Sequence, residues 1–251
     1  LTEAGHNVGN HSFHHEPWLH LYSEQEIEDE LAKTEEIIEK VTGRRPVGFR
    51  GPGFSLSETV LEVLKRRGYL YDASTFPTFL GPIARAYYFM NMKRKLDTQE
   101  KQERKQLFGT MSDGLRPLKP YLWDLSSGGI LEIPVTTMPV AKVPIHISYL
   151  LYLSMYSQAL ALTYFRTALR LCRVTGTEPS ILLHPLDFLG GDDVQDLTFF
   201  PAMNLKGQQK VDLVGRCIDL MCNHFDVRTM EDHANALLQR AHLPKRPPQF
   251  P

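Results

Sequence analysis

The stretch VGFRGPGFSLSETVLEVLKRRGYLYDAS, residues 47–74, contains a strand, a tight turn, a helix and a second strand in that order. Residues 47–50 and 69–71 are short apolar runs typical of buried strands. Between them, Ser55 with Glu58 predicts a capping box that opens a helix, and Gly68 predicts the end of that helix. This order predicts a parallel strand–helix–strand unit.

The same alternation extends along the rest of the chain. Ser23 with Glu26 forms another predicted capping box, and we expect its helix to end at Gly43. Short apolar strands that alternate with amphipathic helices predict an α/β fold with a largely parallel sheet. The further predicted strands are residues 7–11, 130–135, 181–184 and 225–229, and the further helices run through Tyr164, Leu169 and Arg173, over residues 206–223, and from a cap formed by Thr229 with Asp232.

Residues 78–128 interrupt this alternation. They include a charged run from Lys93 to Lys105, several glycines and prolines, and no clear period. We interpret them as an insertion or lid, a kind of loop that often carries function, although a solvated excursion fits equally well. We expect one domain over residues 1–243, followed by a disordered Pro-rich tail, residues 244–251.

Composition narrows the class of protein. The net charge of −1 predicts no basic surface for nucleic acid. Cys172, Cys217 and Cys222 form no CxxC pair, and we interpret them as reduced thiols, which favours the cytoplasm. Residues 147–165 carry no charge but contain serines, tyrosines and a glutamine. A buried or interface-lying helix fits this stretch better than a membrane span, and it leaves peripheral contact with a membrane or a lipid-linked substrate open.

Histidines gather near the start of the chain, where five of the ten lie within the first twenty residues. The centre of this group is GNHSFHH, residues 9–15. His11 and His15 are four residues apart, so a helical turn after a strand would project both imidazoles to one side. Two nitrogen ligands suit zinc or another divalent ion. A polar turn with capping histidines fits the pair equally well.

Three further units place polar side chains at the ends of predicted strands. Arg50, followed by Gly51-Pro52-Gly53, sets a fixed cation beside main-chain N–H groups that could stabilise an oxyanion. Asp72 and His184 each end an apolar strand, and strand ends line the active site in barrel-like α/β folds. Taken singly, an ordinary turn and a structural histidine explain these residues as well.

Taken together and in this order, the units resemble the polysaccharide deacetylase family, which shares the NodB-like deacetylase domain. The resemblance covers residues 1–75 and returns over residues 130–235. HSFHH, residues 11–15, is similar to the family's H-[S/T]-x-x-H motif, which implies that His11 and His15 are metal ligands. Arg50-Gly51-Pro52 is similar to the R-x-P motif.

The resemblance also implies roles for the remaining residues. Arg50 would orient the catalytic base, and the N–H of Gly53, after Pro52, would lie in the oxyanion hole, although most members have an aromatic residue there. Asp72 would pair with the catalytic histidine, in a motif that here lacks its usual tryptophan. In the LLH unit, residues 182–184, His184 would be the general acid and Leu182 would line the acetyl pocket.

The family's first motif, two adjacent aspartates that supply the base and the third metal ligand, should lie well before His11. Residues 1–5 read as the last turn of a helix that Gly5 ends, so we expect the chain to begin after this motif. Asp192 and Asp193 do not occupy the required place. We therefore expect this chain alone to bind metal weakly and to turn over little.

The resemblance implies a distorted (β/α) barrel without its first strands, and a metal-dependent hydrolase that removes N-acetyl groups from a sugar or polysaccharide. Zinc suits the ligands best, and cobalt or another divalent ion would also fit. Expected partners are N-acetylated or lipid-linked sugars. A deformylase or another amidohydrolase of the same fold is one alternative, and a non-catalytic carbohydrate-binding relative is another. An Asp-Asp pair upstream would distinguish enzyme from binder. Localisation stays open, with a cytoplasmic or membrane-peripheral site favoured.

Overall fold

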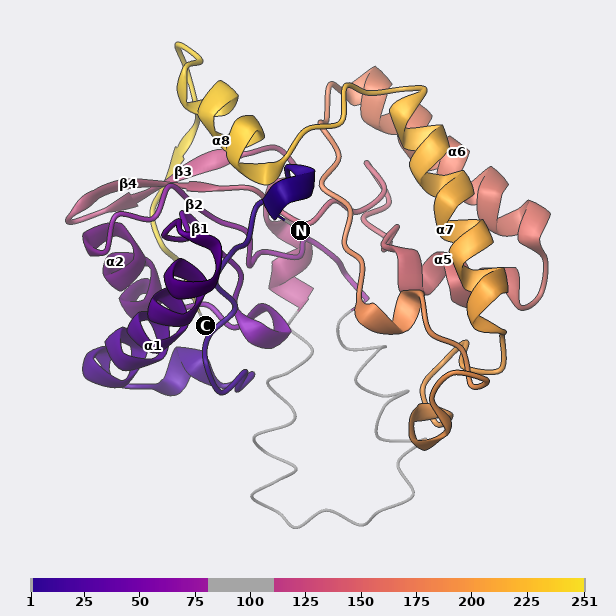
Figure 1. Cartoon of the computed structure of the whole chain (residues 1–251). Coiled ribbons are helices and arrows are strands. Elements are labelled where there is room, and N and C mark those ends of the chain that lie inside the picture. The colour runs from indigo at the N-terminus through magenta and orange to yellow at the C-terminus, as the bar shows by residue number, and fades with distance from the viewer. Residues whose placement is uncertain (1, 81–110, 251) are drawn as a thin grey trace. The chain divides into compact units, whose positions relative to one another are not determined.

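The computed structural model of the chain describes residues 2–80 and 111–250. These residues form two compact units, one from Leu1–Pro134 with Arg228–Pro251 and the other from Val135–Val227, and each is described by itself (Figure 1). The single domain expected over residues 1–243 stays a prediction. The charged run at residues 93–105 lies outside the described residues.

The first unit is built on a five-stranded sheet with the order β1-β2-β4-β3-β5. Pairing is parallel except between β3 and β4, which form an antiparallel hairpin. The predicted α/β class is confirmed, but the expected barrel is not, because the pairings of the described strands leave an open sheet. The strands are β1 (Gly48–Phe49), β2 (Tyr71–Asp72), β3 (Tyr121–Leu125), β4 (Gly128–Glu132) and β5 (Lys245–Arg246).

Helices cover both faces of this sheet. Helices α1 (Glu24–Thr42) and α2 (Glu58–Arg66) pack on one face, and α8 (Met230–Leu238) packs on the other (Figure 1). Successive strand residues point to opposite faces, so Ile130 joins the α1–α2 core while Leu131 joins the α8 core. Both faces of β4 are therefore buried, which explains why its sequence is an apolar run.

The predicted helix starts were right at two of three places. Ser23 forms the capping box with Glu26, and the hydroxyl of Thr229 accepts a hydrogen bond from the N–H of Asp232. The cap predicted at Ser55 is wrong, because α2 begins two residues later and Ser57 accepts from the N–H of Val60. The Ser55 hydroxyl instead accepts from the N–H of His20, which lies in the short 3-10 helix Leu19–Leu21 before α1.

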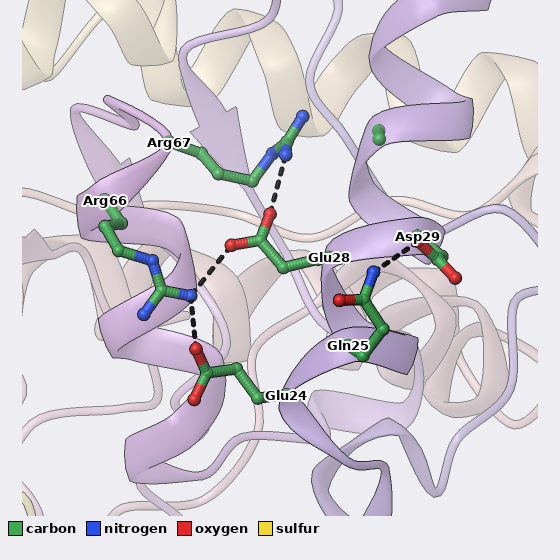
Figure 2. A pocket seen from close by; sticks show the side chains of 7 residues that line it. Glu24, Gln25, Glu28, Asp29, Arg66 and Arg67 are labelled. Atoms are coloured by element: carbon green, nitrogen blue, oxygen red, sulfur yellow. Dashed lines mark hydrogen bonds and ion pairs between the residues drawn. The ribbon is translucent and has the colours of Figure 1, made fainter.

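Charged side chains join α1 to α2 around a surface pocket (Figure 2). Arg66 contacts Glu24 at 2.9 Å and Glu28 at 2.8 Å, and Arg67 contacts Glu28 at 2.6 Å. Figure 2 also shows Gln25 and Asp29 among the residues that line the pocket, where the Gln25 amide donates to the Asp29 carboxylate. Since the arginines of this pocket are engaged in ion pairs with its glutamates, we interpret it as part of the contact between the two helices.

The hairpin and the tail differ from expectation. Strand β3 lies inside the stretch interpreted as an insertion, and the tail expected to be disordered pairs with it through β5. The Arg116 guanidinium lies over the rings of both Trp123 and Phe250, at 5.7 and 5.2 Å from their centroids. These contacts hold the Pro-rich end against the sheet.

The second unit packs three helices around an apolar core. They are α5 (Ile147–Ser154), α6 (Gln158–Thr175) and α7 (Gly207–Cys222), and α6 and α7 run alongside each other (Figure 1). The uncharged stretch 147–165 is divided, since Ser157 caps a new helix. Within residues 2–80 and 111–250, no helix has both the length and the apolar character that crossing a membrane requires.

Two predicted strands are wrong. Residues 181–184 and 225–229 are not in strands. Residues 180–182 run extended and bond to Thr136 and to the start of α5, where the carbonyl of Leu182 accepts from the N–H of Ile147. Pro185 then opens a short 3-10 turn, so the apolar run ends before a ladder can form.

Candidate functional site

The loop of residues 11–15 brings two imidazoles together. The Nε2 atoms of His11 and His15 lie 3.2 Å apart, and their rings meet edge to face with centroids at 4.8 Å. The expected helical turn is wrong: Ser12 and His15 both have φ of 59°. The predicted strand 7–11 shrinks to one bridge between Asn10 and Phe49. A left-handed loop, rather than a helix, sets the two side chains side by side.

A backbone carbonyl sets the tautomer of His11. Its Nδ1 lies 2.6 Å from the carbonyl oxygen of Arg50. A carbonyl only accepts hydrogen bonds, so Nδ1 carries a proton, and in the neutral imidazole Nε2 then presents its lone pair toward His15. Metal-binding histidines show this arrangement, in which the second ring nitrogen donates to a carbonyl or carboxylate.

The spacing of the two nitrogens fits a divalent ion. Two nitrogens bound tetrahedrally to zinc at ordinary bond lengths would lie about 3.3 Å apart. The observed 3.2 Å between Nε2 atoms matches that value, and both side chains are exposed. Across the described parts of the chain, no group of three or more His, Cys, Asp or Glu side chains could hold a metal. The pair can therefore supply two ligands of a metal site.

Neighbouring side chains frame this loop. The Asn10 side-chain oxygen accepts from the N–H of Ser12 at 2.9 Å, and its amide donates to the hydroxyl of Tyr69 at 2.7 Å. The Ser12 hydroxyl accepts from the N–H of His15 at 3.1 Å. Asn10 is buried, so these bonds tie the loop to the interior of the first unit.

The turn after Arg50 is closely packed. The Arg50 Nε donates to the carbonyl of Ala73 at 2.9 Å, and burial lowers the pKa of Arg50 although Asp72 opposes this. A Cβ on Gly51 would lie 2.0 Å from the carbonyl oxygen of Ser55, so this turn requires glycine. Gly53 has φ of 58°, which glycine adopts readily. Pro52 is buried beside it.

Asp72 is linked to that turn through a serine. Its carboxylate accepts from the N–H of Ser74 at 3.1 Å and from its hydroxyl at 2.5 Å. The Ser74 hydroxyl in turn accepts from the N–H of Gly51 at 2.8 Å. Asp72 therefore holds the backbone that leads into Gly53.

A second buried carboxyl, which the sequence did not single out, lies next to Asp72. Glu132 accepts from Thr75 and from the indole of Trp123. Burial raises the pKa of Asp72, and burial together with the neighbouring Asp72 raises that of Glu132 well above its ordinary value. The sequence feature that could have pointed to Glu132 is its position as an acidic residue inside the apolar run 130–135.

His184 lies in the second unit with a local carboxylate. Its Nδ1 is 3.8 Å from Asp187 and 3.2 Å from the hydroxyl of Ser148, which donates to Asp187 at 2.7 Å. Asp187 is buried, while the His184 side chain is 51% exposed. Neither Asp187 nor Ser148 was predicted from the sequence, although an acidic residue three positions after His184 was a usable signal.

His146 and Leu182 lie close to His184. The His146 ring centroid is 6.0 Å from that of His184, and burial, with a smaller contribution from His184, lowers the pKa of His146 to about 3. Leu182 is buried. The predicted pairing of Asp72 with His184 joins residues of the two units and stays a prediction.

Comparison with known proteins finds similarity over the part of the chain that holds the histidine loop. The family model described as polysaccharide deacetylase matches residues 1–71, which include the histidine loop and Arg50. The chain is 38% identical over 74 residues to a peptidoglycan deacetylase of Helicobacter pylori, covering 30% of this chain and 25% of the relative. It is 41% identical over 70 residues to the peptidoglycan-N-acetylmuramic acid deacetylase of Bacillus subtilis, covering 28% and 26%.

The matched segment therefore spans about a quarter of the length of these relatives. A solved structure described as a putative polysaccharide deacetylase from Mycobacterium smegmatis shares the fold, with a TM-score of 0.58 at 16% identity, and the likeness covers 100% of this chain and 68% of that one. The match to the family model over residues 1–71 and the shared fold agree with the motifs, so this part of the chain is similar to polysaccharide deacetylases.

Proposed function

We propose that the protein to which this chain belongs hydrolyses the N-acetyl amide of a peptidoglycan-type glycan, with a divalent metal at His11 and His15. The observation that carries the proposal is the pair of imidazole Nε2 atoms 3.2 Å apart, within the segment that resembles peptidoglycan deacetylases. A metal held there would polarise the acetyl carbonyl and lower the pKa of bound water. Zinc suits two imidazoles, and cobalt is a second candidate.

In this proposal the base that takes the proton from the attacking water is the upstream aspartate that the family resemblance implies, and the chain's own residues supply the other functions. The N–H of Gly53 stabilises the oxyanion that develops on the acetyl oxygen, and Arg50 and Asp72 hold the turn that presents it. His184 donates a proton to the leaving amine, and Leu182 contacts the acetyl methyl. Ser148 and Asp187, which contact His184, support this role by fixing its ring.

Peptidoglycan is our preferred substrate class because the relatives named above are peptidoglycan deacetylases. A lipid-linked sugar is the weaker candidate. It was suggested by the uncharged stretch 147–165, which the structure divides between α5 and α6. A non-catalytic glycan-binding role is the alternative from a different class.

Product analysis on the natural full-length protein tests the proposal. Incubation with peptidoglycan should release acetate and expose free amines, and a chelator should abolish both. Acetate release that continues unchanged in a variant with both His11→Ala and His15→Ala would refute the metal role. Formate instead of acetate would identify a deformylase, and glycan binding without either product would identify the binding protein.

A further inference from the structure

Glu30 on α1 contacts the segment between the two imidazoles. Its Oε2 accepts hydrogen bonds from the main-chain N–H groups of Phe13 at 3.0 Å and His14 at 2.9 Å. Its Oε1 contacts the Nδ1 of His14. The Glu30 side chain is only 5% exposed, so this carboxylate is directed at the loop rather than at solvent.

The loop needs such an anchor because its backbone is unfavourable. Ser12 and His15 both adopt the left-handed region, which costs a residue with a side chain on the order of 1 kcal/mol or more. Phe13 and His14, the residues that Glu30 holds, lie between these two positions. A carboxylate that accepts two adjacent N–H groups restrains the loop where no secondary structure does.

We propose that Glu30 is a positioning residue for the metal site: its carboxylate holds residues 12–15 so that the Nε2 atoms of His11 and His15 converge before a metal binds. This inference rests on the proposed function. It goes beyond it by assigning a role to a residue on a separate helix. Groups that orient metal ligands typically change metal affinity by about tenfold to a hundredfold when they are removed.

Zinc titration of the natural full-length protein, by calorimetry with a competing chelator, tests this role. Glu30→Gln keeps the side-chain size but loses the charge, and we expect its zinc affinity to fall by about tenfold or more. Glu36→Gln, an exposed position on the same helix, should leave the affinity unchanged. Ser23→Ala removes the cap of that helix, and it should lower stability without weakening zinc binding.

The outcomes separate the two claims. If the wild-type protein binds zinc and His11→Ala abolishes binding, but Glu30→Gln binds as tightly as the wild type, Glu30 is not a positioning residue and the proposed function stands. If His11→Ala leaves zinc binding intact, the proposed site itself is wrong, and the role of Glu30 falls with it. A loss of affinity in Ser23→Ala equal to that in Glu30→Gln would reduce Glu30 to a stability effect.

A second variant covers the case in which Glu30→Gln does not fold. His14→Ala removes one of the three contacts from a side chain that is 55% exposed, so the fold should survive. We expect its zinc affinity to fall severalfold, less than for Glu30→Gln. Wild-type affinity in His14→Ala, together with an unfolded Glu30→Gln, would overturn the proposal.

Discussion

Asp72 on β2 and Glu132 on β4 are direct partners across two parallel strands, and both side chains are fully buried. In-register partners point to the same face of a sheet, so the two carboxyl groups meet inside the protein. Burial disfavours the charged form of both carboxyls, and the neighbouring Asp72 raises the pKa of Glu132 further. We infer that the pair retains a proton to a higher pH than exposed carboxyls do.

This retained proton predicts how stability depends on pH. The pKa of Glu132 is raised in the folded state. At a pH above the ordinary pKa of a glutamate, the folded protein therefore binds more protons than the unfolded chain. Its contribution to the free energy of unfolding therefore falls as the pH rises. Glu132→Gln, which stays neutral, should flatten this fall, as measured by urea unfolding between about pH 5 and pH 8. A slope equal to that of the wild type, with Glu36→Gln as control, would contradict the shared proton.

His146 should produce the opposite trend in the second unit. Burial lowers its folded pKa from 6.5 to about 3, so the unfolded chain binds the extra proton in that window. The contribution of His146 to the free energy of unfolding is lost as the pH falls below the ordinary histidine pKa of 6.5. We expect ring-nitrogen NMR shifts of His146 to report a neutral imidazole at about pH 5. A charged ring there would rule out the buried, neutral state.

The contact between Asp187 and His184 predicts a change in catalysis. Asp187→Asn removes the charge beside the His184 ring. The side-chain oxygen of the asparagine can still accept the hydrogen bond from the main-chain N–H of His184. If His184 is the general acid, kcat for acetate release should fall by about tenfold or more while KM changes little. Asp196→Asn, in the same unit but apart from His184, is the matched control. If kcat and its pH profile are unchanged in Asp187→Asn, Asp187 does not position His184 for catalysis.

Two glycines should respond oppositely to alanine. The Cβ of Gly51→Ala would lie 2.0 Å from the Ser55 carbonyl, so the free energy of unfolding should fall by about 2 kcal/mol or more. Gly215 lies inside α7 with open space around its Cβ position, so Gly215→Ala should raise it by about 0.5–1 kcal/mol. Thermal and urea unfolding of the two variants would measure both effects. A tolerated Gly51→Ala would mean that the turn relaxes easily.

Short sequence patterns were enough to predict the helix ends that are set by neighbouring residues. The capping box at Ser23, the end of α1 at Gly43 and the cap at Thr229 depend on neighbours in the sequence, and each was predicted correctly. The proximity of His11 and His15 was also predicted, but from a helical turn that these residues do not form. The left-handed backbone that produces it could not be predicted, because Ser12 and His15 carry no signal for positive φ.

Features that depend on distant partners were missed. Strand β3 became visible only through its pairing with β4 and β5, and the tail is held by the contact of Phe250 with Arg116. The apolar residues 181–184 have the composition of a strand, yet they lie beside α5 and Thr136 rather than in the sheet. Glu132 was overlooked because an isolated acid in an apolar run is informative only when its neighbour is known.

In the proposed function, hydrolysis depends on a metal held by His11 and His15. The most direct measurement determines bound zinc and acetate release in the same samples of the natural full-length protein, for wild type, His11→Ala, His15→Ala and the exposed control His6→Ala. Both imidazole variants should lose zinc and acetate release together, while His6→Ala should retain both. Acetate release that persists in a zinc-free His11→Ala variant would contradict the proposed dependence on metal.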